Sequence, residues 1–256
     1  MKTTTLVCFV TAMAVAAPAA ANMRGPRVVE QSPSSALYKP KDADLVVTRE
    51  DLTFTCGAAK SCQIVAEYHI RADAAVTVEL AFVTPGQVTI QAQVGDAKAD
   101  VKTVDARPIP DDTLHSWGFG IRRDELHEAR FQAALTEGQN IIRVEYVQPI
   151  ALVETGYGYF WDGEFVDTWV YESWPLQEWK RSEDFTLNLT VSTPRAKPSW
   201  WARNIGNYTE VACSMWPTEF KPTRKDEGGR LWLTGTLTEV PDRIHCTRGS
   251  DEYVSD

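Results

Sequence analysis

The chain contains, at residues 157–171, the segment YGYFWDGEFVDTWVY, its densest run of aromatic residues. Asp162-Gly163 stands at the centre of this segment, between two runs of alternating residues. An Asp-Gly pair in this setting indicates a two-residue β-hairpin turn, because the type I′ turn needs a positive φ at both central positions. The segment therefore predicts strands over 157–161 and 164–171.

Both faces of this predicted hairpin are aromatic. A two-residue turn places Phe160 opposite Phe165, and alternate residues point to opposite faces of the sheet. One face then carries Tyr157, Tyr159, Trp161 and Glu164. The other face carries Phe160, Phe165, Asp167, Trp169 and Tyr171. A half-buried antiparallel hairpin normally has one apolar and one polar face, so the sequence predicts different roles for the two.

We expect the second face to lie in the core, because it has one charged member among its aromatic residues. The first face is the candidate ligand-binding surface, since Tyr and Trp combine a flat apolar ring with a hydrogen-bonding tip. The alternative is that the C-terminal part of the chain covers it, through Trp200 and Trp201. Burial is a common fate for such a surface, because monomeric proteins rarely expose large apolar patches.

Alternation with a period of two recurs along most of the chain. It is clearest at residues 45–55, 63–71, 76–82, 88–94, 142–146 and 185–191. Eight or more short strands separated by turn signals are typical of an all-β antiparallel sandwich, either immunoglobulin-like or jelly-roll-like. No long helical period alternates with the strands, which argues against a parallel α/β sheet.

Three local segments carry further predictions. Residues 122–135 leave two interpretations open, a short helix in the first half and a strand from Arg130 to Leu135. Ser173-Trp174-Pro175 predicts a short helical turn with a serine cap and proline in the first turn. Leu231, Leu233 and Leu237 predict a hairpin that leads toward Cys246.

The N-terminus has the features of a signal peptide over residues 1–21. Met1-Lys2 is followed by an apolar run from 6 to 17 and by Ala19-Ala20-Ala21, which match a basic region, an apolar region and a small-residue cleavage site. The apolar run is too short for a membrane span, and no later run approaches the required ~20 residues. We therefore expect an exported protein, periplasmic or extracellular, with no transmembrane segment.

Four cysteines remain after the predicted cleavage. An even number in an exported protein indicates disulfides, although four cysteines allow three pairings. Proximity in the sequence favours Cys56–Cys62 and Cys213–Cys246. A zinc site is the alternative, but the usual Cys-x-x-Cys spacing is missing.

The strand pattern also suggests an organisation of the chain. We expect an extended N-terminal arm over 22–44, a β-sandwich domain over 45–193, a linker over 194–199 and a C-terminal extension over 200–256. The extension holds the second cysteine pair and is either separate from the main domain or packed on it.

Charge and motifs exclude several function classes. The formal net charge of −9 at pH 7 disfavours nucleic-acid binding, which depends on Lys and Arg at phosphates. The histidines lack a compact metal-binding spacing, and no nucleophile elbow, phosphate loop or dinucleotide fingerprint is present. We predict no metal and no cofactor.

The remaining interpretation is a non-enzymatic protein that binds a protein partner or a glycan through Tyr157, Tyr159, Trp161 and Glu164. A structural or assembly protein of the cell envelope is the second hypothesis. A carbohydrate-active hydrolase is the third, because such enzymes need two carboxylates. The carboxylates among the aromatic residues are Asp162, Glu164, Asp167 and Glu172.

Overall fold

The computed structural model of the chain describes residues 22–24, 44–57, 61–85, 88–105, 126–154, 165–195, 210–216, 218 and 220–249. Within these ranges the structure is almost entirely β-strand, and all strand pairs but one are antiparallel. The all-β antiparallel class predicted from the sequence is therefore confirmed. A short 3-10 helix, η3 (Trp174–Glu178), is the exception to the strand content.

The largest element is an eight-stranded sheet, here called the large sheet, with the order β14-β15-β12-β2-β3-β9-β5-β6. Its strands are β2 (Leu45–Cys56), β3 (Ser61–Ala72), β5 (Ile90–Val94), β6 (Ala97–Ala99), β9 (Gly138–Pro149), β12 (Lys180–Pro194), β14 (Thr223–Glu227) and β15 (Arg230–Leu237). The one parallel pair, β12 with β2, joins strands that lie far apart in the sequence.

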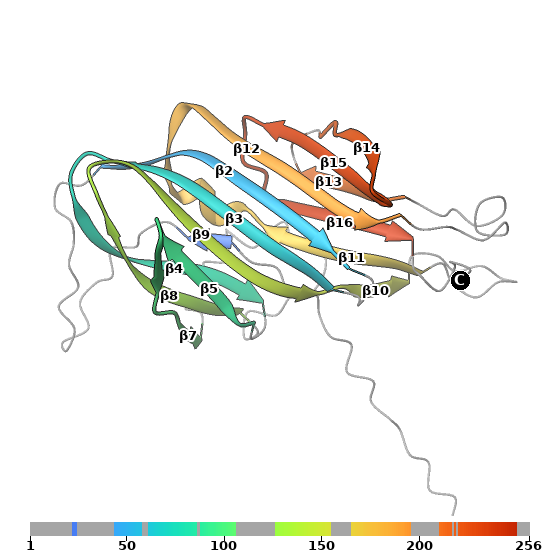
Figure 1. Cartoon of the computed structure of the whole chain (residues 1–256), viewed down its shortest axis with the longest axis horizontal. Helices are drawn as coiled ribbons and strands as arrows, with labels where there is room; N and C mark the ends of the chain where they lie inside the picture. Colours follow the sequence, from blue (N-terminus) through green and yellow to red (C-terminus); the bar gives the residue numbers. More distant parts are fainter. Residues whose placement is uncertain are drawn as a thin grey trace, which may run out of the picture.

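Two four-stranded sheets accompany the large sheet (Figure 1). The first small sheet has the order β1-β4-β8-β7, with β1 (Asn22–Arg24), β4 (Val76–Pro85), β8 (Leu126–Leu135) and β7 (Lys102–Asp105). The second small sheet has the order β10-β11-β16-β13, with β10 (Ala151–Glu154), β11 (Phe165–Glu172), β16 (Arg243–Gly249) and β13 (Ala212–Trp216).

Both small sheets pack on the same face of the large sheet. Phe82 of β4 contacts Tyr146 with ring centroids 5.6 Å apart, and Phe54 contacts Tyr171 of β11 at 6.1 Å. Phe54 and Tyr146 both lie opposite Ile64 in the large sheet, and opposite residues share a face. The opposite face of the large sheet, here called the outer face, carries the half-buried and exposed side chains of the same strands.

The predicted hairpin register is wrong for Phe165. This residue lies opposite Glu154 of β10 rather than Phe160, and the ladder continues to Ala151 opposite Thr168. The strand that pairs with the start of β11 is therefore β10, and not the segment 157–161 that the turn signal predicted. Residues 155–164, including the predicted turn at Asp162-Gly163, lie outside the described residues.

Two further local predictions need correction. Residues 126–129 belong to a strand, not a helix, because β8 pairs with β4 along its whole length. Residues 122–125 lie outside the described part. The helical turn at η3 is present with proline at its start, but Ser173 makes no side-chain cap. Its hydroxyl instead donates to the carbonyl oxygen of Pro241 at 2.7 Å.

The C-terminal part of the chain contributes strands to the large sheet and to the second small sheet. β15 pairs with β12 and β14, whereas Cys246 lies on β16 in the second small sheet. The predicted hairpin toward Cys246 is therefore wrong. Backbone pairing connects residues on either side of the predicted linker, 194–199. The domain division itself stays a prediction, because strand pairing does not measure independent folding.

Both predicted disulfides are present. Cys56–Cys62 joins directly opposite residues of β2 and β3, and Cys213–Cys246 joins directly opposite residues of β13 and β16. Among the described residues no helix is long and apolar enough to cross a membrane.

Candidate functional site

Several strands end at the same end of the sandwich, to the right in Figure 1. These are the C-terminal ends of β10, β12 and β16, with the start of β11. Val166 lies opposite Gly249, and Ala212 lies opposite Thr247, so the start of β13 belongs to this end as well. Residues 155–164 connect β10 to β11, and residues 196–209 follow β12, so both segments are attached at this end.

The two segments contain the aromatic residues of the predicted ligand surface and of its alternative cover. Tyr157, Tyr159, Trp161 and Glu164 lie in the first, and Trp200 and Trp201 lie in the second. All six lie outside the described residues. The described strands fix only where these two segments begin and end.

A small cleft, here called the strand-end cleft, lies between the strand ends of the large sheet and those of the second small sheet. Its lining residues are Thr193, Pro194, Arg195, Glu210, Val211, Asp226, Leu231 and Arg248. The cleft has a volume of about 20 Å³, which is room for about one water molecule. A ligand larger than water would therefore lie over the cleft rather than inside it.

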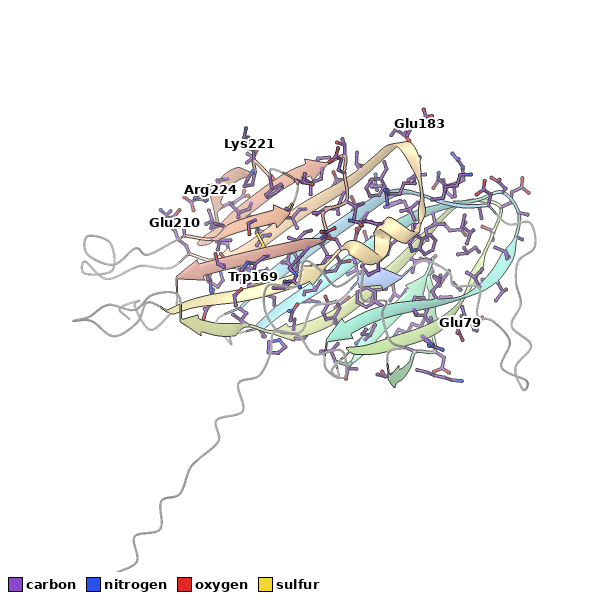
Figure 2. All side chains as sticks on the ribbon, turned by 180° about the vertical axis from the view of Figure 1, so that it is seen from behind. Glu79, Trp169, Glu183, Glu210, Lys221 and Arg224 are labelled. Carbon is purple, nitrogen blue, oxygen red and sulfur yellow. A yellow bond between two sulfur atoms is a disulfide. The ribbon has the colours of Figure 1, made fainter. Side chains whose placement is uncertain are left out.

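The rim of the cleft carries two exposed ion pairs. Arg195 contacts Asp226 at 3.1 Å, and Arg224 contacts Glu210 at 3.5 Å. Figure 2 shows Glu210 and Arg224 together at this corner of the molecule. Arg224 also donates to the carbonyl oxygen of Val211 at 3.2 Å, which ties β14 to the start of β13.

Local sequence explains how β14 reaches this position. The two residues that connect β14 to β15 are Gly228 and Gly229, both with positive φ. Such a turn needs glycine-like residues because side chains disfavour positive φ at both positions. The turn places Glu227 opposite Arg230, and the backbone N–H of Arg195 donates to the Gly229 carbonyl oxygen at 2.9 Å.

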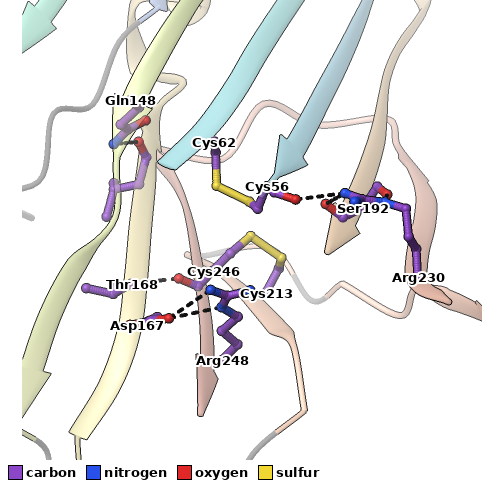
Figure 3. The surroundings of a disulfide bond; sticks show 11 residues. Cys56, Cys62, Gln148, Asp167, Thr168, Ser192, Cys213, Arg230, Cys246 and Arg248 are labelled. Carbon is purple, nitrogen blue, oxygen red and sulfur yellow. Dashed lines mark hydrogen bonds and ion pairs between the residues drawn. A yellow bond between two sulfur atoms is a disulfide. The ribbon is translucent and has the colours of Figure 1, made fainter. Parts of the chain in front are cut away.

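A buried ion pair lies behind the rim. Asp167 of β11 lies opposite Arg248 of β16. Its Oδ2 accepts a hydrogen bond from Arg248 Nε at 3.0 Å and lies 3.0 Å from Nη2 in an ion pair. Asp167 is fully buried, and Arg248 is 4% exposed. Figure 3 draws this pair with the Cys213–Cys246 disulfide, whose Cys246 lies two residues before Arg248. The guanidinium is thus held in a fixed orientation at the cleft wall.

The predicted core face of β11 is confirmed for Trp169 and Tyr171, which are both fully buried. Thr168 and Val170 on the opposite face are also buried. Both faces of the described part of β11 are therefore covered, in contrast to the one-sided burial expected from the sequence. Phe160, and the side chain of Phe165, lie outside the described residues.

The structure also bears on the carboxylates of the hydrolase hypothesis. Asp167 is buried and engaged with Arg248, which removes it as an accessible acid or base. Asp162 and Glu164 lie outside the described residues, as does the side chain of Glu172. Within the part of the chain that the structure describes, no group of three or more His, Cys, Asp or Glu side chains could hold a metal ion.

Sequence reasoning did not identify Arg248, Arg195 or Glu50 as residues of interest. The sequence did hint at a partner such as Arg248. Asp167 occupies a predicted inward position between two aromatic residues, and a buried carboxyl group needs either a cation nearby or a proton. The cation that pairs with such a carboxyl group lies on a strand far away in the sequence, so residue spacing along the chain does not identify it.

Neither a protein-family model nor a curated protein matches the sequence. The fold is similar to that of a Legionella pneumophila protein whose proposed role is nutrient binding, with a TM-score of 0.50 and 11% identity over 90% of this chain and 72% of that one. At that identity the likeness shows the fold alone.

Two other solved structures are less similar. They are an M1 zinc metallopeptidase from Deinococcus radiodurans (TM-score 0.38, 14% identity, 80% of this chain) and leukotriene A4 hydrolase from Saccharomyces cerevisiae (TM-score 0.43, 9% identity, 85% of this chain). This chain spans 42% and 32% of their respective lengths. Likenesses at these scores carry no argument about this protein.

Proposed function

We propose that this protein is an exported, non-enzymatic binding protein that holds a glycan over the strand-end cleft. Tyr157, Tyr159 and Trp161 would supply the flat surface for sugar rings, with Glu164 as a hydrogen-bond acceptor. The observation that carries the proposal is that this aromatic segment is attached at the end of the sandwich where the cleft and its ion pairs lie.

The charges around the cleft favour a neutral, hydroxyl-rich ligand. Arg195, Arg224 and Arg248 each have a carboxylate partner, so the site presents donors and acceptors without a large excess of either charge. Sugar hydroxyls both donate and accept hydrogen bonds and can therefore use Arg N–H groups and carboxylate oxygens side by side. A polyanion is a poorer candidate, because the whole protein has a formal net charge of −9.

The architecture is compatible with recognition by connecting segments. Loops at the end of a rigid sandwich commonly carry binding residues, since the sheets fix where each loop begins and ends. The two disulfides agree with an oxidising compartment. Together with the signal-like N-terminus they support the periplasm or the extracellular space. The nutrient-binding role proposed for the Legionella protein belongs to a chain with the same general fold and adds no ligand.

The test is a glycan array followed by polysaccharide pull-down with the full exported chain. Trp161→Ala and Tyr157→Ala should each reduce affinity by about tenfold or more, which corresponds to about 1.4 kcal/mol for a central aromatic contact. Val147→Ala is the matched control, because Val147 is 58% exposed on β9 and does not line the cleft. It should leave binding unchanged.

Other outcomes point to the remaining hypotheses. Capture of a defined envelope protein that Trp161→Ala abolishes, with no glycan bound, would favour a protein partner. Silent variants in both assays would favour a structural or assembly role. Release of reducing sugar that depends on Asp162 or Glu164 would establish a hydrolase instead.

A further inference from the structure

β2 contains a bulge that turns a carboxyl group into the core. Val47 lies opposite Ile70 of β3, and Arg49 lies opposite the next residue, His69, so Thr48 is an extra residue on β2. An extra residue reverses the alternation of a strand. Val47 is fully buried before the bulge, and Glu50 is fully buried after it. A regular strand would have directed Arg49 inward and Glu50 outward.

The buried carboxyl group lies between the large sheet and the second small sheet. Tyr171 of β11 donates to Glu50 Oε1 at 2.6 Å, and the hydroxyls of Tyr171 and Tyr68 are 2.8 Å apart. Tyr68 is the residue directly opposite Glu50 on β3. Glu50 Oε2 is buried and has no hydrogen-bond partner among the described protein groups. A carboxylate with so few donors is poorly stabilised in its charged form.

The energetics follow from this environment. Burial raises the pKa of Glu50 to about 7, and hydrogen bonds from Tyr171 and Tyr68 oppose the rise without cancelling it. No positive charge is among the causes of the shift, and the neighbouring Asp51 adds to it. The folded protein therefore keeps this group protonated at pH values at which an unfolded or solvated glutamate is ionised.

We propose that Glu50 is a pH-sensitive contact between the large sheet and the second small sheet. Protonated Glu50 is compatible with the packed β11, whereas ionised Glu50 favours separation of β11 from β2 and β3, because separation exposes the charge to water. β11 also carries Asp167, the partner of the cleft residue Arg248. The effect on ligand binding rests on the proposed function, but the effect on sheet packing does not.

The groups that face Glu50 restrict the interpretation of a pH titration. They are Tyr171 from β11, Tyr68 from β3, Tyr146 from β9 and the apolar Leu187 from β12, with Asp51 on its own strand. Burial raises the pKa values of Tyr146 and Tyr171 well above their usual range, so neither ionises near neutral pH.

His245 of β16 is a second titratable group beside β11 in the described part of the chain. It lies opposite Val170 and is 2.5 Å from the Thr168 hydroxyl. Burial lowers its pKa, with Arg243 adding to the effect. A histidine with a lowered pKa loses stabilisation as the pH falls. Its effect therefore has the opposite sign to that of Glu50.

The sign for Glu50 follows from its raised value. Its contribution to stability is complete below about 4.5, the ordinary value, and is lost as the pH rises through about 7. Hydrogen exchange of β11 amides, measured on the full chain at pH 5 and pH 8 and corrected for intrinsic rates, reports this directly. We expect the opening constant of β11 to rise on the order of 50-fold over that interval.

Glu50→Gln should reduce this change to less than about threefold, because glutamine is neutral at both pH values and can still accept from Tyr171. The matched control is Glu67→Gln on the outer face of β3, which should retain the full pH response. Tyr171→Phe removes a donor to the carboxyl group and should move the midpoint of the response upward.

The proposal is overturned if Glu50→Gln keeps the wild-type pH response, or if β11 of the wild-type protein shows none. If Glu50→Gln does not fold, an unchanged midpoint in Tyr171→Phe overturns the proposal equally. Because exchange is measured without ligand, failure of the glycan assay leaves this result intact.

Discussion

Among the described residues, two carboxyl groups are completely buried, and their surroundings differ. Asp167 lies opposite Arg248, whose guanidinium donates a hydrogen bond to one carboxylate oxygen through Nε and pairs with the same oxygen through Nη2. Glu50 accepts from Tyr171, and no positive charge offsets its burial. Both contacts involve the same face of β11, through Asp167 at one end and Tyr171 near the other, with the buried Trp169 between them.

The difference shows that burial destabilises an ionised carboxylate in both places, and that the neighbouring group determines whether the carboxyl group stays ionised or protonated. A cation stabilises the ionised form of Asp167, whereas Glu50 meets the same cost by keeping its proton. The first solution depends on a partner cation. The second makes packing depend on pH in the range where the proton is lost.

The largest expected effect comes from removing the cation. Arg248→Met keeps much of the side-chain volume but leaves Asp167 buried without its partner charge, and should cost roughly 3–5 kcal/mol of unfolding free energy at pH 7. The loss should shrink at pH 5, because protonation would then make Asp167 resemble Glu50. Urea unfolding at both pH values measures this. A double change, Asp167→Leu with Arg248→Met, is the control and should recover much of the loss.

The covalent supports of the two regions should also differ. Cys213–Cys246 closes 33 residues beside the ion pair, and Cys56–Cys62 closes 6 residues on β2 and β3. Loop-closure entropy predicts losses of about 4 and about 2 kcal/mol when each pair is replaced by serine. Denaturant midpoints of the two double variants provide the comparison. A larger loss from the smaller loop would show that entropy of the unfolded chain is not the controlling term.

A smaller effect is expected from the tyrosine that contacts Glu50. Tyr171→Phe removes the 2.6 Å hydrogen bond and should cost about 1–3 kcal/mol. The cost should be greater at pH 8 than at pH 5, because the donor mainly stabilises the ionised carboxylate. Thermal or urea unfolding at both pH values tests this. Tyr146→Phe is the control and should cost less, since its hydroxyl has no hydrogen-bond partner among the described residues.

The smallest effect is expected for an exposed carboxylate. Glu67 contacts Arg143 at 2.7 Å, with side chains 34% and 37% exposed. Glu67→Gln should change the unfolding free energy by less than about 1 kcal/mol, because solvent screens an exposed pair. Added salt should reduce the effect further. Unfolding at low and high ionic strength measures it, and a loss as large as that of Arg248→Met would contradict the role given to burial.

Local sequence information predicted a substantial part of this fold. The strands at 45–55, 63–71 and 185–191 were recognisable because buried apolar residues alternate with more exposed residues along each of them. Both disulfides could be paired by proximity. The aromatic segment was identified as a hairpin, but its register at Phe165 was wrong, because a turn signal says nothing about competing partner strands.

The sequence by itself determined the all-β class, the extent of most strands and the cysteine pairs, since these depend on residues near one another in the chain. Only the tertiary structure decided which strands became neighbours. Glu50 and Tyr171 are 121 residues apart, and Asp167 and Arg248 are 81 apart. Such contacts depend on how the three sheets share one core. A one-residue bulge in β2 was enough to place Glu50 in that core, because side-chain direction reverses at every residue of a strand.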